Sequence, residues 1–279
     1  MKKISRRSFL AAAGLSVAAL ALTACGGSSA STASSVASSA ASSEAASTSA
    51  AAGELTTVEA GKLTMATNAA FPPYEMTTDA GEFEGIDIET AQAIADKLGL
   101  ELQIDDMDFD AALLSVQQGK ADIVMAGVTV TDERKAVMDF SDSYATGIQS
   151  IIVPEGSDIA SPDDLAGKKI GTQRGTTGYI YCTDDFGEDA VVAYDDGLTA
   201  VQALNNGQVD AVVIDNAPAQ EFIAANPGLK ILDTSYAEED YAIGMAKGSS
   251  LEDAVNAALE ELKADGTLQS IVDKYITAE

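Results

Sequence analysis

A short pattern that occurs twice constrains the fold of this chain more than any other feature. Leu113–Gly127 reads LLSVQQGKADIVMAG, and Ala200–Asp215 reads AVQALNNGQVDAVVID. Each copy has an apolar helical stretch, a glycine that would stop the helix, an aspartate and an apolar run typical of a buried strand. A single sheet with a coincidental second match would also fit so loose a pattern. The aligned glycine, aspartate and apolar positions favour two related α/β lobes.

Helical and strand patterns also alternate along the chain from Leu55 onward. The apolar spacing predicts a strand, a helix, a second helix and a second strand, in that order, over 62–67, 87–98, 109–118 and 121–127. Such alternation is typical of an α/β architecture with parallel strand pairs. The two copies of the repeat end at Gly127 and Asp215. We expect both residues at the carboxyl ends of parallel strands, where open α/β sheets bind their ligands.

Composition excludes several classes of function. The 279 residues include no histidine, which excludes His-based catalytic triads and His-containing metal sites, and we expect neither a metal nor a cofactor. The formal net charge is −28, and so acidic a surface repels phosphate groups, so we expect no nucleic-acid partner. Cys25 and Cys182 are too few for a disulfide framework, and Cys182 is expected to be an incidental unpaired thiol.

The N-terminus has the layout of an export signal. MKKISRRSFLAAAGLSVAALALTACGG begins with basic residues, continues with an apolar stretch too short for a spanning helix and reaches a cysteine after small residues. Leu22–Cys25 resembles a bacterial lipobox, so we expect residues 1–25 to be a signal peptide ending at a lipidated Cys25. An uncleaved membrane anchor is the alternative. The adjacent Arg6 and Arg7 resemble a twin-arginine signal, while the general secretory route stays open.

Residues 26–53 consist of Gly, Ala, Ser and Thr, with Val36 and Glu44 as the exceptions. Such a segment cannot bury enough apolar surface to offset its loss of conformational entropy on ordering. We therefore expect a disordered linker with a coil span on the order of 30 Å. The predicted order along the chain is a lipid anchor, a flexible linker and a globular body.

Beyond the signal the chain has two arginines, and both follow a predicted strand end in a loop rich in Gly and Thr. Arg134 lies in the first turn of a helix that Thr131 would begin, where a cation opposes the helix dipole and needs an anionic partner. That partner is either a bound carboxylate or a nearby acidic residue on the surface. Arg174 precedes Gly175–Gly178, a turn whose N–H groups would suit an anion.

Three further side chains are candidates for the cleft, and each has a structural alternative. Asp215 ends the apolar strand AVVI and would suit a ligand ammonium group, or else it caps a helix that begins near Pro218. Phe71 and Phe109 follow short extended stretches, so they either stack on a ligand side chain or belong to the core.

The body of the chain resembles a known family over about 55–275. The similar stretches, in order, are TNAAFPPYEM, GEFEGIDIETAQAIADKLG, MDFDAALLSVQQGKADIVMAGVTVTDERKAVMDFSDSY, GKKIGTQRGTTG and VQALNNGQVDAVVIDNAPA. They resemble the polar amino-acid-binding proteins of bacterial ABC importers, the solute-binding proteins of family 3. The resemblance implies an α/β, two-lobed, periplasmic-binding-protein-like (type II) fold with two hinge crossings and a ligand in the interlobe cleft. It implies one lobe at 55–148 plus 240–279 and another at 149–239.

The resemblance also implies roles for individual residues. Arg134 and the backbone at Thr129 and Thr177 would hold the α-carboxylate of the ligand. Asp215, the Gly127 carbonyl and the Thr129 hydroxyl would hold its α-ammonium group. The other implied ligand-binding residues are the aromatic pair Phe71 and Phe109, the turn residue Thr176, and three that tune side-chain choice: Asn68, Gln173 and Asp87, the last with a structural role as its alternative.

Two departures from the family pattern limit what the resemblance implies. Asn68 stands where many relatives have an aspartate, so the charge of the ligand side chain stays open between neutral polar, cationic and cystine. Arg174 is not a usual ligand contact in the family.

The sequence therefore predicts an extracytoplasmic substrate-binding lipoprotein of an ABC transporter rather than an enzyme. We expect a monomer, held by lipid at the outer face of the cell membrane, that closes its lobes on a polar L-amino acid and delivers it to a permease. A dehydratase-like enzyme on the same fold and a ligand-sensing partner of a membrane receptor are the alternatives.

Overall fold

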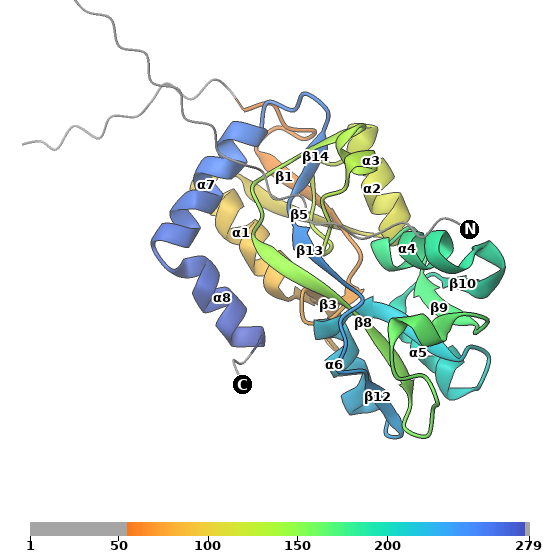
Figure 1. The fold of residues 1–279 in the computed structure, drawn as a ribbon. Coiled ribbons are helices and arrows are strands. Elements are labelled where there is room, and N and C mark those ends of the chain that lie inside the picture. Colours follow the sequence, from red (N-terminus) through yellow and green to blue (C-terminus); the bar gives the residue numbers. More distant parts are fainter. Residues whose placement is uncertain (1–54, 277–279) are drawn as a thin grey trace, which may run out of the picture. The chain divides into compact units, whose positions relative to one another are not determined.

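The computed structural model describes residues 55–276 of the chain. The predicted signal peptide at 1–25, the lipidation site Cys25 and the linker at 26–53 lie outside this range. The described residues form two larger sheets, each with helices on both faces, and a small sheet (Figure 1). None of the helices within 55–276 is both long and apolar enough to cross a membrane.

The first lobe is built on a five-stranded sheet in the order β5–β1–β6–β14–β7. β1 runs parallel to β5 and β6, whereas β14 is antiparallel to β6 and β7. Because β14 comes from near the end of the chain, the C-terminal segment returns to this lobe. The strands are β1 (Lys62–Thr67), β5 (Glu101–Asp106), β6 (Ile123–Val124), β7 (Met138–Phe140) and β14 (Gly244–Ala246).

Helices cover both faces of this sheet because successive side chains of a strand point in opposite directions. Leu63 and Met65 of β1 pack in one apolar cluster with residues of α1 and α7, and Ala66 packs in another with residues of α2. Figure 1 shows α7 and α8 beside α1, although they lie far apart in sequence. The helices are α1 (Ile86–Leu98), α2 (Phe109–Gln117), α3 (Asp132–Lys135), α7 (Glu252–Ala264) and α8 (Thr267–Tyr275).

The second lobe is built on a sheet in the order β10–β9–β11–β8–β12, and β13 also pairs with β8. Alternate side chains of its strands also pack against different helices. Val212 and Ile214 of β11 pack with residues of α5 and α6, whereas Val213 packs with Cys182 of α4. The strands are β8 (Ala145–Pro154), β9 (Ile170–Gln173), β10 (Val191–Tyr194), β11 (Ala211–Asp215), β12 (Leu229–Ile231) and β13 (Ala237–Tyr241). The helices are η1 (Pro162–Leu165), α4 (Thr177–Phe186), η2 (Glu188–Ala190), α5 (Gly197–Asn205) and α6 (Asn216–Ala225).

A small sheet follows β1 and leads into α1. It consists of β2 (Ala70–Phe71), β3 (Glu75–Thr77) and β4 (Phe83–Glu84), paired in that order. Its β3 is attached to the start of α1, where the N–H of Asp87 donates to the carbonyl oxygen of Tyr74 at 2.8 Å. This attachment places Glu75 beside the first turn of α1.

The predicted repeat is present, and its two aspartates make equivalent contacts. Asp122 accepts a hydrogen bond from the N–H of Thr64 in β1 at 2.8 Å, and Asp210 accepts one from the N–H of Lys169, just before β9, at 2.7 Å. Each aspartate therefore attaches the start of one strand to the start of its parallel neighbour. The predicted parallel pairs are confirmed as β1 with β6 and β9 with β11.

The helices predicted over 87–98 and 109–118 are confirmed within one residue, as α1 and α2. The strand predicted over 121–127 is shorter, since β6 covers Ile123–Val124 alone. After Met125 the chain turns away from the ladder at Gly127, where φ is +54° and the N–H donates to the Asp87 carboxylate instead of to a strand. The turn directs the following residues toward the space between the lobes.

Two chain crossings join the lobes, as the family resemblance implies. They run through β8 and β13, which pair in antiparallel fashion. The crossings are also bonded to each other just before β8, where Tyr144 N–H donates to the Tyr241 carbonyl and Ser141 N–H to the Ile243 carbonyl, both at 2.9 Å. The proposed lobe boundaries, after residues 148 and 239, fall inside these two strands.

We predict that Gly85→Ala destabilises the fold because a Cβ at this position would lie 2.2 Å from the Tyr74 carbonyl oxygen, with φ at +131°. A backbone clash of this kind together with the φ strain should lower the free energy of unfolding by about 2–4 kcal/mol in urea titrations. Gly81→Ala is the matched control, because φ is +82° there and no atom lies within 4 Å. Equal losses in the two variants would contradict the steric explanation.

Candidate functional site

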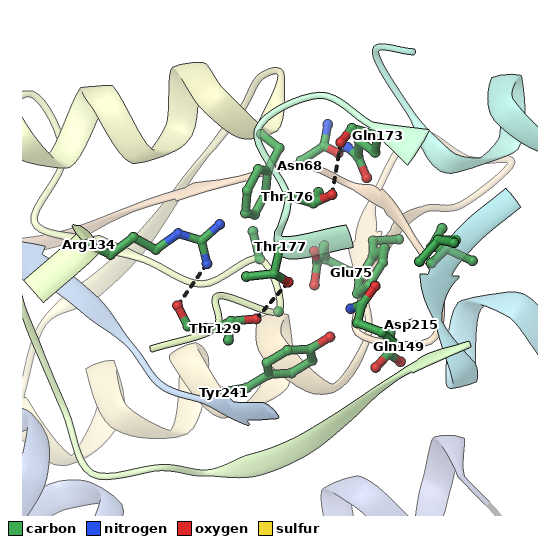
Figure 2. A pocket seen from close by; sticks show the side chains of 16 residues that line it. Asn68, Glu75, Thr129, Arg134, Gln149, Gln173, Thr176, Thr177, Asp215 and Tyr241 are labelled. Carbon is green, nitrogen blue, oxygen red and sulfur yellow. Dashed lines mark hydrogen bonds between the residues drawn. The ribbon is translucent and has the colours of Figure 1, made fainter. Parts of the chain in front are cut away.

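A polar pocket lies between the two lobes (Figure 2). It contains about 430 Å³ of space outside protein atoms, counting its mouth. The lining residues come from both lobes and from the crossings: Asn68, Phe71, Glu75, Phe109, Ala126, Gly127, Thr129, Arg134, Gln149, Gln173, Thr176, Thr177, Val213, Ile214, Asp215 and Tyr241. Within residues 55–276 no group of three or more acidic or cysteine side chains is arranged to hold a metal ion.

Arg134 enters the pocket from the first lobe. It lies in α3, a single turn that begins as predicted at Thr131, whose hydroxyl accepts the Arg134 N–H at 3.2 Å. The residue is 7% exposed, and its guanidinium donates to two carbonyl oxygens, of Thr129 at 2.7 Å and of Gly175 at 3.1 Å. Burial lowers the pKa of the guanidinium, and the negative charge of Glu239 opposes that effect.

The surface ion pair considered for Arg134 is absent, because no carboxylate in the described part of the chain lies within 4.0 Å of its nitrogens. Its guanidinium lies 5.4 Å from the centre of the Phe109 ring, in a cation–π contact. A buried cation held by carbonyl dipoles and an aromatic ring retains its attraction for an anion.

Arg174 is the other arginine that sequence reasoning singled out, and the structure does not bring it into the pocket. Its side chain is 52% exposed and pairs with Asp195 at 3.4 Å on the surface. The loop that follows it does reach the pocket. Thr176 caps α4 by accepting the Tyr179 N–H at 3.3 Å, and Thr177 is the first residue of that helix. The first N–H groups of a helix have no partner within it, so they suit an anion.

Direct contacts hold the lobes together across the pocket. The Gln173 side chain donates to the Asn68 side chain at 2.8 Å, and the bond from Arg134 to the Gly175 carbonyl also joins the two lobes. Gly175 lies so close to the first lobe that a Cβ there would be 3.2 Å from the Asp110 Cβ. The structure therefore describes the arrangement in which the lobes meet.

Asp215 approaches the pocket from the second lobe, and both roles considered for it fit the structure. It caps α6, since its carboxylate accepts the Ala217 N–H at 3.0 Å, and its other oxygen accepts the Ile148 N–H at 2.7 Å. The residue is 2% exposed and still lines the pocket. Burial raises the pKa of Asp215 to about 6, although the two backbone hydrogen bonds and the Tyr241 hydroxyl act in the opposite direction.

Asp87 is the predicted site residue that does not line the pocket. It is fully buried behind the lining, where its carboxylate accepts the Gly127 N–H at 3.0 Å and the Tyr144 hydroxyl at 2.7 Å. Burial raises its pKa to about 6 against the lowering effect of these bonds. The structural alternative fits Asp87, because it fixes the turn at Gly127 and contacts one of the crossings.

Phe71 and Phe109 line the pocket and also belong to apolar clusters, so the two interpretations of each ring are compatible. Phe71 stacks on Tyr74 with a centroid separation of 5.7 Å. Phe109 is 5% exposed and packs against α2 and β6 residues. Their positions are held by the protein rather than by a ligand.

Sequence reasoning missed three polar residues of the lining, which are Glu75, Gln149 and Tyr241, and a fourth behind them, Glu239. One Glu239 oxygen accepts hydrogen bonds from the Thr129 and Thr177 hydroxyls, at 3.0 and 2.9 Å, and from the Gln149 side chain at 3.0 Å. Gln149 lies on the crossing strand β8, Glu239 and Tyr241 lie on the crossing strand β13, and Glu75 begins β3 of the small sheet. The alternate spacing of Ala237, Glu239 and Tyr241 in AEEDY is the one sequence signal for the β13 residues, since it predicts that Glu239 shares a strand face with two apolar side chains.

Comparison with known proteins places the chain in a family. The family model for bacterial extracellular solute-binding proteins, family 3, matches residues 63–278. The L-cystine-binding protein TcyJ of Escherichia coli (strain K12) is 33% identical over 226 residues, which cover 79% of this chain and 85% of that protein.

Solved structures are similar in sequence and in fold. The arginine-, lysine-, histidine-binding protein ArtJ from Geobacillus stearothermophilus has a TM-score of 0.75 at 34% identity and covers 78% of this chain and 96% of its own. An ancestral arginine-binding protein bound to glutamine has a TM-score of 0.75 at 42% identity and covers 78% of this chain and 99% of its own.

The chain belongs to the bacterial extracellular solute-binding proteins, family 3. It has their type II periplasmic-binding-protein fold, and it is a solute-binding protein rather than an enzyme.

We predict that Glu239→Ala lowers the free energy of unfolding by about 2–4 kcal/mol, because it leaves the hydroxyls of Thr129 and Thr177 and the Gln149 amide without their buried acceptor. Chemical denaturation would measure the loss. Glu238→Ala, on the exposed face of the same strand, should change stability by less than about 0.5 kcal/mol. A Glu239 variant as stable as the Glu238 control would contradict a structural role for the carboxylate.

Proposed function

We propose that this chain captures an L-α-amino acid between its lobes and delivers it to the permease of an ABC importer. We further propose that a lipid on Cys25 and the linker at 26–53 hold the protein, as a monomer, at the outer face of the cell membrane. The single observation that carries the binding role is a buried guanidinium and a buried carboxylate, Arg134 and Asp215, lining one pocket from opposite lobes.

The carboxylate end of the ligand would meet Arg134. This cation has no carboxylate partner among the described residues, and the helix start at Thr177 lies in the same pocket with Thr129. A carboxylate would add charge-assisted hydrogen bonds to the guanidinium and to backbone N–H groups. Gln173 and Asn68 would then face the side chain of the ligand, because they close the pocket through their mutual bond.

The ammonium end would meet Asp215 and the Gly127 carbonyl. Gly127 is held at its left-handed φ by the bond from its N–H to Asp87, so its carbonyl has a fixed direction. Thr129 would contact both the carboxylate and the ammonium group of the ligand. Its hydroxyl already contacts both Thr177 and Glu239. The ligand would thus be held at two opposite charges.

The ligand would favour closure of the lobes because its two binding charges belong to different lobes. Arg134 belongs to α3 of the first lobe and Asp215 to β11 of the second, so a ligand satisfies both only when the lobes meet. Each charge-assisted bond contributes about 1.5–3 kcal/mol net, which the ligand adds to the closed form alone. The crossing strands β8 and β13 would carry the hinge motion.

The ligand class is supported by what similar proteins bind. TcyJ is an L-cystine-binding protein, ArtJ binds arginine, lysine and histidine, and the ancestral protein was solved with glutamine. All of these ligands share the α-carboxylate and α-ammonium groups to which the pocket offers opposite charges. We therefore propose a polar or cationic L-amino acid.

We predict that Arg134→Ala raises the dissociation constant of the amino-acid ligand at least about 100-fold, because both charge-assisted bonds to the carboxylate are lost. Isothermal titration calorimetry with the ligand chosen from a thermal-shift screen of amino acids would measure it. Arg174→Ala is the matched control, since this arginine is exposed and paired with Asp195, and its affinity should be unchanged. An Arg134 variant that binds as tightly as the control would refute the carboxylate role.

We predict that affinity falls as the pH drops through about 6, since Asp215 must be ionised to hold an ammonium group and its pKa is raised to about 6. Each pH unit below that value should weaken binding about tenfold. Calorimetry between pH 7 and pH 5 would measure the fall.

The same raised pKa has the opposite effect on the ligand-free fold. Between about pH 4 and 6 the folded protein binds more protons at Asp215 than the unfolded chain, so this group's contribution to stability decreases as the pH rises through that window. Binding should therefore be lost in acid without unfolding, which circular dichroism would check. Affinity that stays constant down to pH 5 would contradict the ammonium role of Asp215.

A further inference from the structure

The hydroxyl groups of Thr129 and Thr177 face each other between the lobes, with their oxygens 3.4 Å apart (Figure 2). Thr129 follows the turn at Gly127 in the first lobe, and Thr177 is the first residue of α4 in the second. A hydroxyl carries a single proton, so each of the two can donate only one hydrogen bond. The direction of that proton determines what each hydroxyl offers to a ligand in the pocket.

Glu239 accepts both of these protons. Its Oε2 accepts the Thr129 hydroxyl at 3.0 Å and the Thr177 hydroxyl at 2.9 Å, and the Gln149 side-chain amide is a third donor at 3.0 Å. Both O–H bonds to Glu239 are shorter than the contact between the two hydroxyls, and a carboxylate oxygen is a stronger acceptor than a hydroxyl oxygen. Because three donors converge on Oε2, this oxygen carries no proton of its own.

Burial and the backbone keep this arrangement in place. The four residues of the network are between 2% and 6% exposed, so bulk water does not compete for the hydroxyl protons. Glu239 pairs with Gly147 of β8, where a Cβ would lie 2.4 Å from the Tyr241 ring. A Thr129 hydroxyl that turned its proton away would leave a buried acceptor of Glu239 with one donor fewer, which costs free energy.

We propose that Glu239 is a positioning, specificity-determining residue that holds the Thr129 proton, so that the Thr129 hydroxyl oxygen can only accept and the pocket selects ligands with an ammonium group at Cα. Glu239 acts through Thr129 and does not itself line the pocket. The inference rests on the proposed function, because it requires an amino acid whose ammonium group lies beside Thr129.

The chemistry of the ammonium group matches the acceptors around it. In the proposed binding mode these are the Thr129 hydroxyl oxygen, the Gly127 carbonyl and the Asp215 carboxylate. An ammonium group has three N–H donors and no acceptor, so it can satisfy all three. A proton of Thr129 pointing into the pocket would instead oppose one of the N–H groups.

The 2-hydroxy acid with the same side chain is the informative competitor. It keeps the carboxylate for Arg134, but its hydroxyl has one proton, which the charged Asp215 would take. The lone pairs of the ligand hydroxyl would then face the oxygens of Thr129 and Gly127, which have no proton to offer. Glu239 therefore contributes to the rejection of the hydroxy acid.

The first test compares Glu239→Ala with Glu238→Ala, a variant on the exposed face of the same strand. Calorimetry gives the dissociation constants of whichever of L-arginine, L-glutamine and L-histidine the wild type binds most tightly and, by displacement, of its 2-hydroxy acid. Without Glu239 the Thr129 proton is free to turn toward the ligand oxygen. The preference for the amino acid over the hydroxy acid should therefore fall at least about fivefold, and in Glu238→Ala it should stay within about twofold of wild type.

A purely structural role of Glu239 gives a different pattern, because a loosened pocket weakens both ligands alike. An unchanged preference in a folded Glu239→Ala variant would overturn the inference, while amino-acid binding by the wild type would leave the proposed function intact. A wild-type protein that binds none of the amino acids would instead refute the proposed function.

The second test retains Glu239, so it stays decisive even if Glu239→Ala folds poorly. Thr129→Val keeps the shape of the side chain and removes its hydroxyl. If the hydroxyl only accepts, affinity for the amino acid should fall at least about tenfold, whereas affinity for the 2-hydroxy acid should stay within about threefold of wild type. Equal losses for the two ligands would show that Thr129 donates to both, and that result would overturn the inference.

Discussion

The guanidinium of Arg134 is withdrawn from water between the two lobes, and the rest of the site is organised around its charge. Carbonyl oxygens of Thr129 and Gly175 accept its hydrogen bonds, and the Phe109 ring lies against it. Neutral dipoles solvate a buried cation incompletely, so the residue keeps an attraction for an anion that the described part of the chain does not satisfy. Because one of the carbonyls belongs to the second lobe, the same charge also helps to join the lobes.

The side of the pocket away from Arg134 is rich in carboxyl groups, and these groups differ in how many hydrogen bonds they already accept. Asp87 is fully used in holding Gly127 and Tyr144, and Asp215 accepts two backbone bonds while it lines the pocket. Glu75 has no such partners. Burial raises the pKa of all three, so this side of the pocket is less negative without a ligand than its composition indicates.

The crossing strands β8 and β13 join the lobes and also hold polar side chains of the pocket by hydrogen bonds. Glu239 on β13 accepts hydrogen bonds from Thr129 of the first lobe and Thr177 of the second, and Gln149 on β8 completes the set. The residues that would contact the ligand are therefore bonded to the strands about which the lobes would turn. Such an arrangement links the position of the lobes to the orientation of the binding groups.

The sequence by itself determined the two α/β lobes, the parallel strand pairs and the placement of Arg134 and Asp215 at the ends of elements that meet in the pocket. These features depend on local patterns, such as apolar spacing, a stopping glycine and a helix cap, which the chain carries within a few residues. Only the tertiary structure decided that Arg174 pairs on the surface, that Asp87 supports Gly127 from behind the lining, and that Glu75 and Glu239 are buried beside the site. Those outcomes depend on contacts between residues distant in sequence, and burial and hydrogen bonding arise from such contacts rather than from residue type.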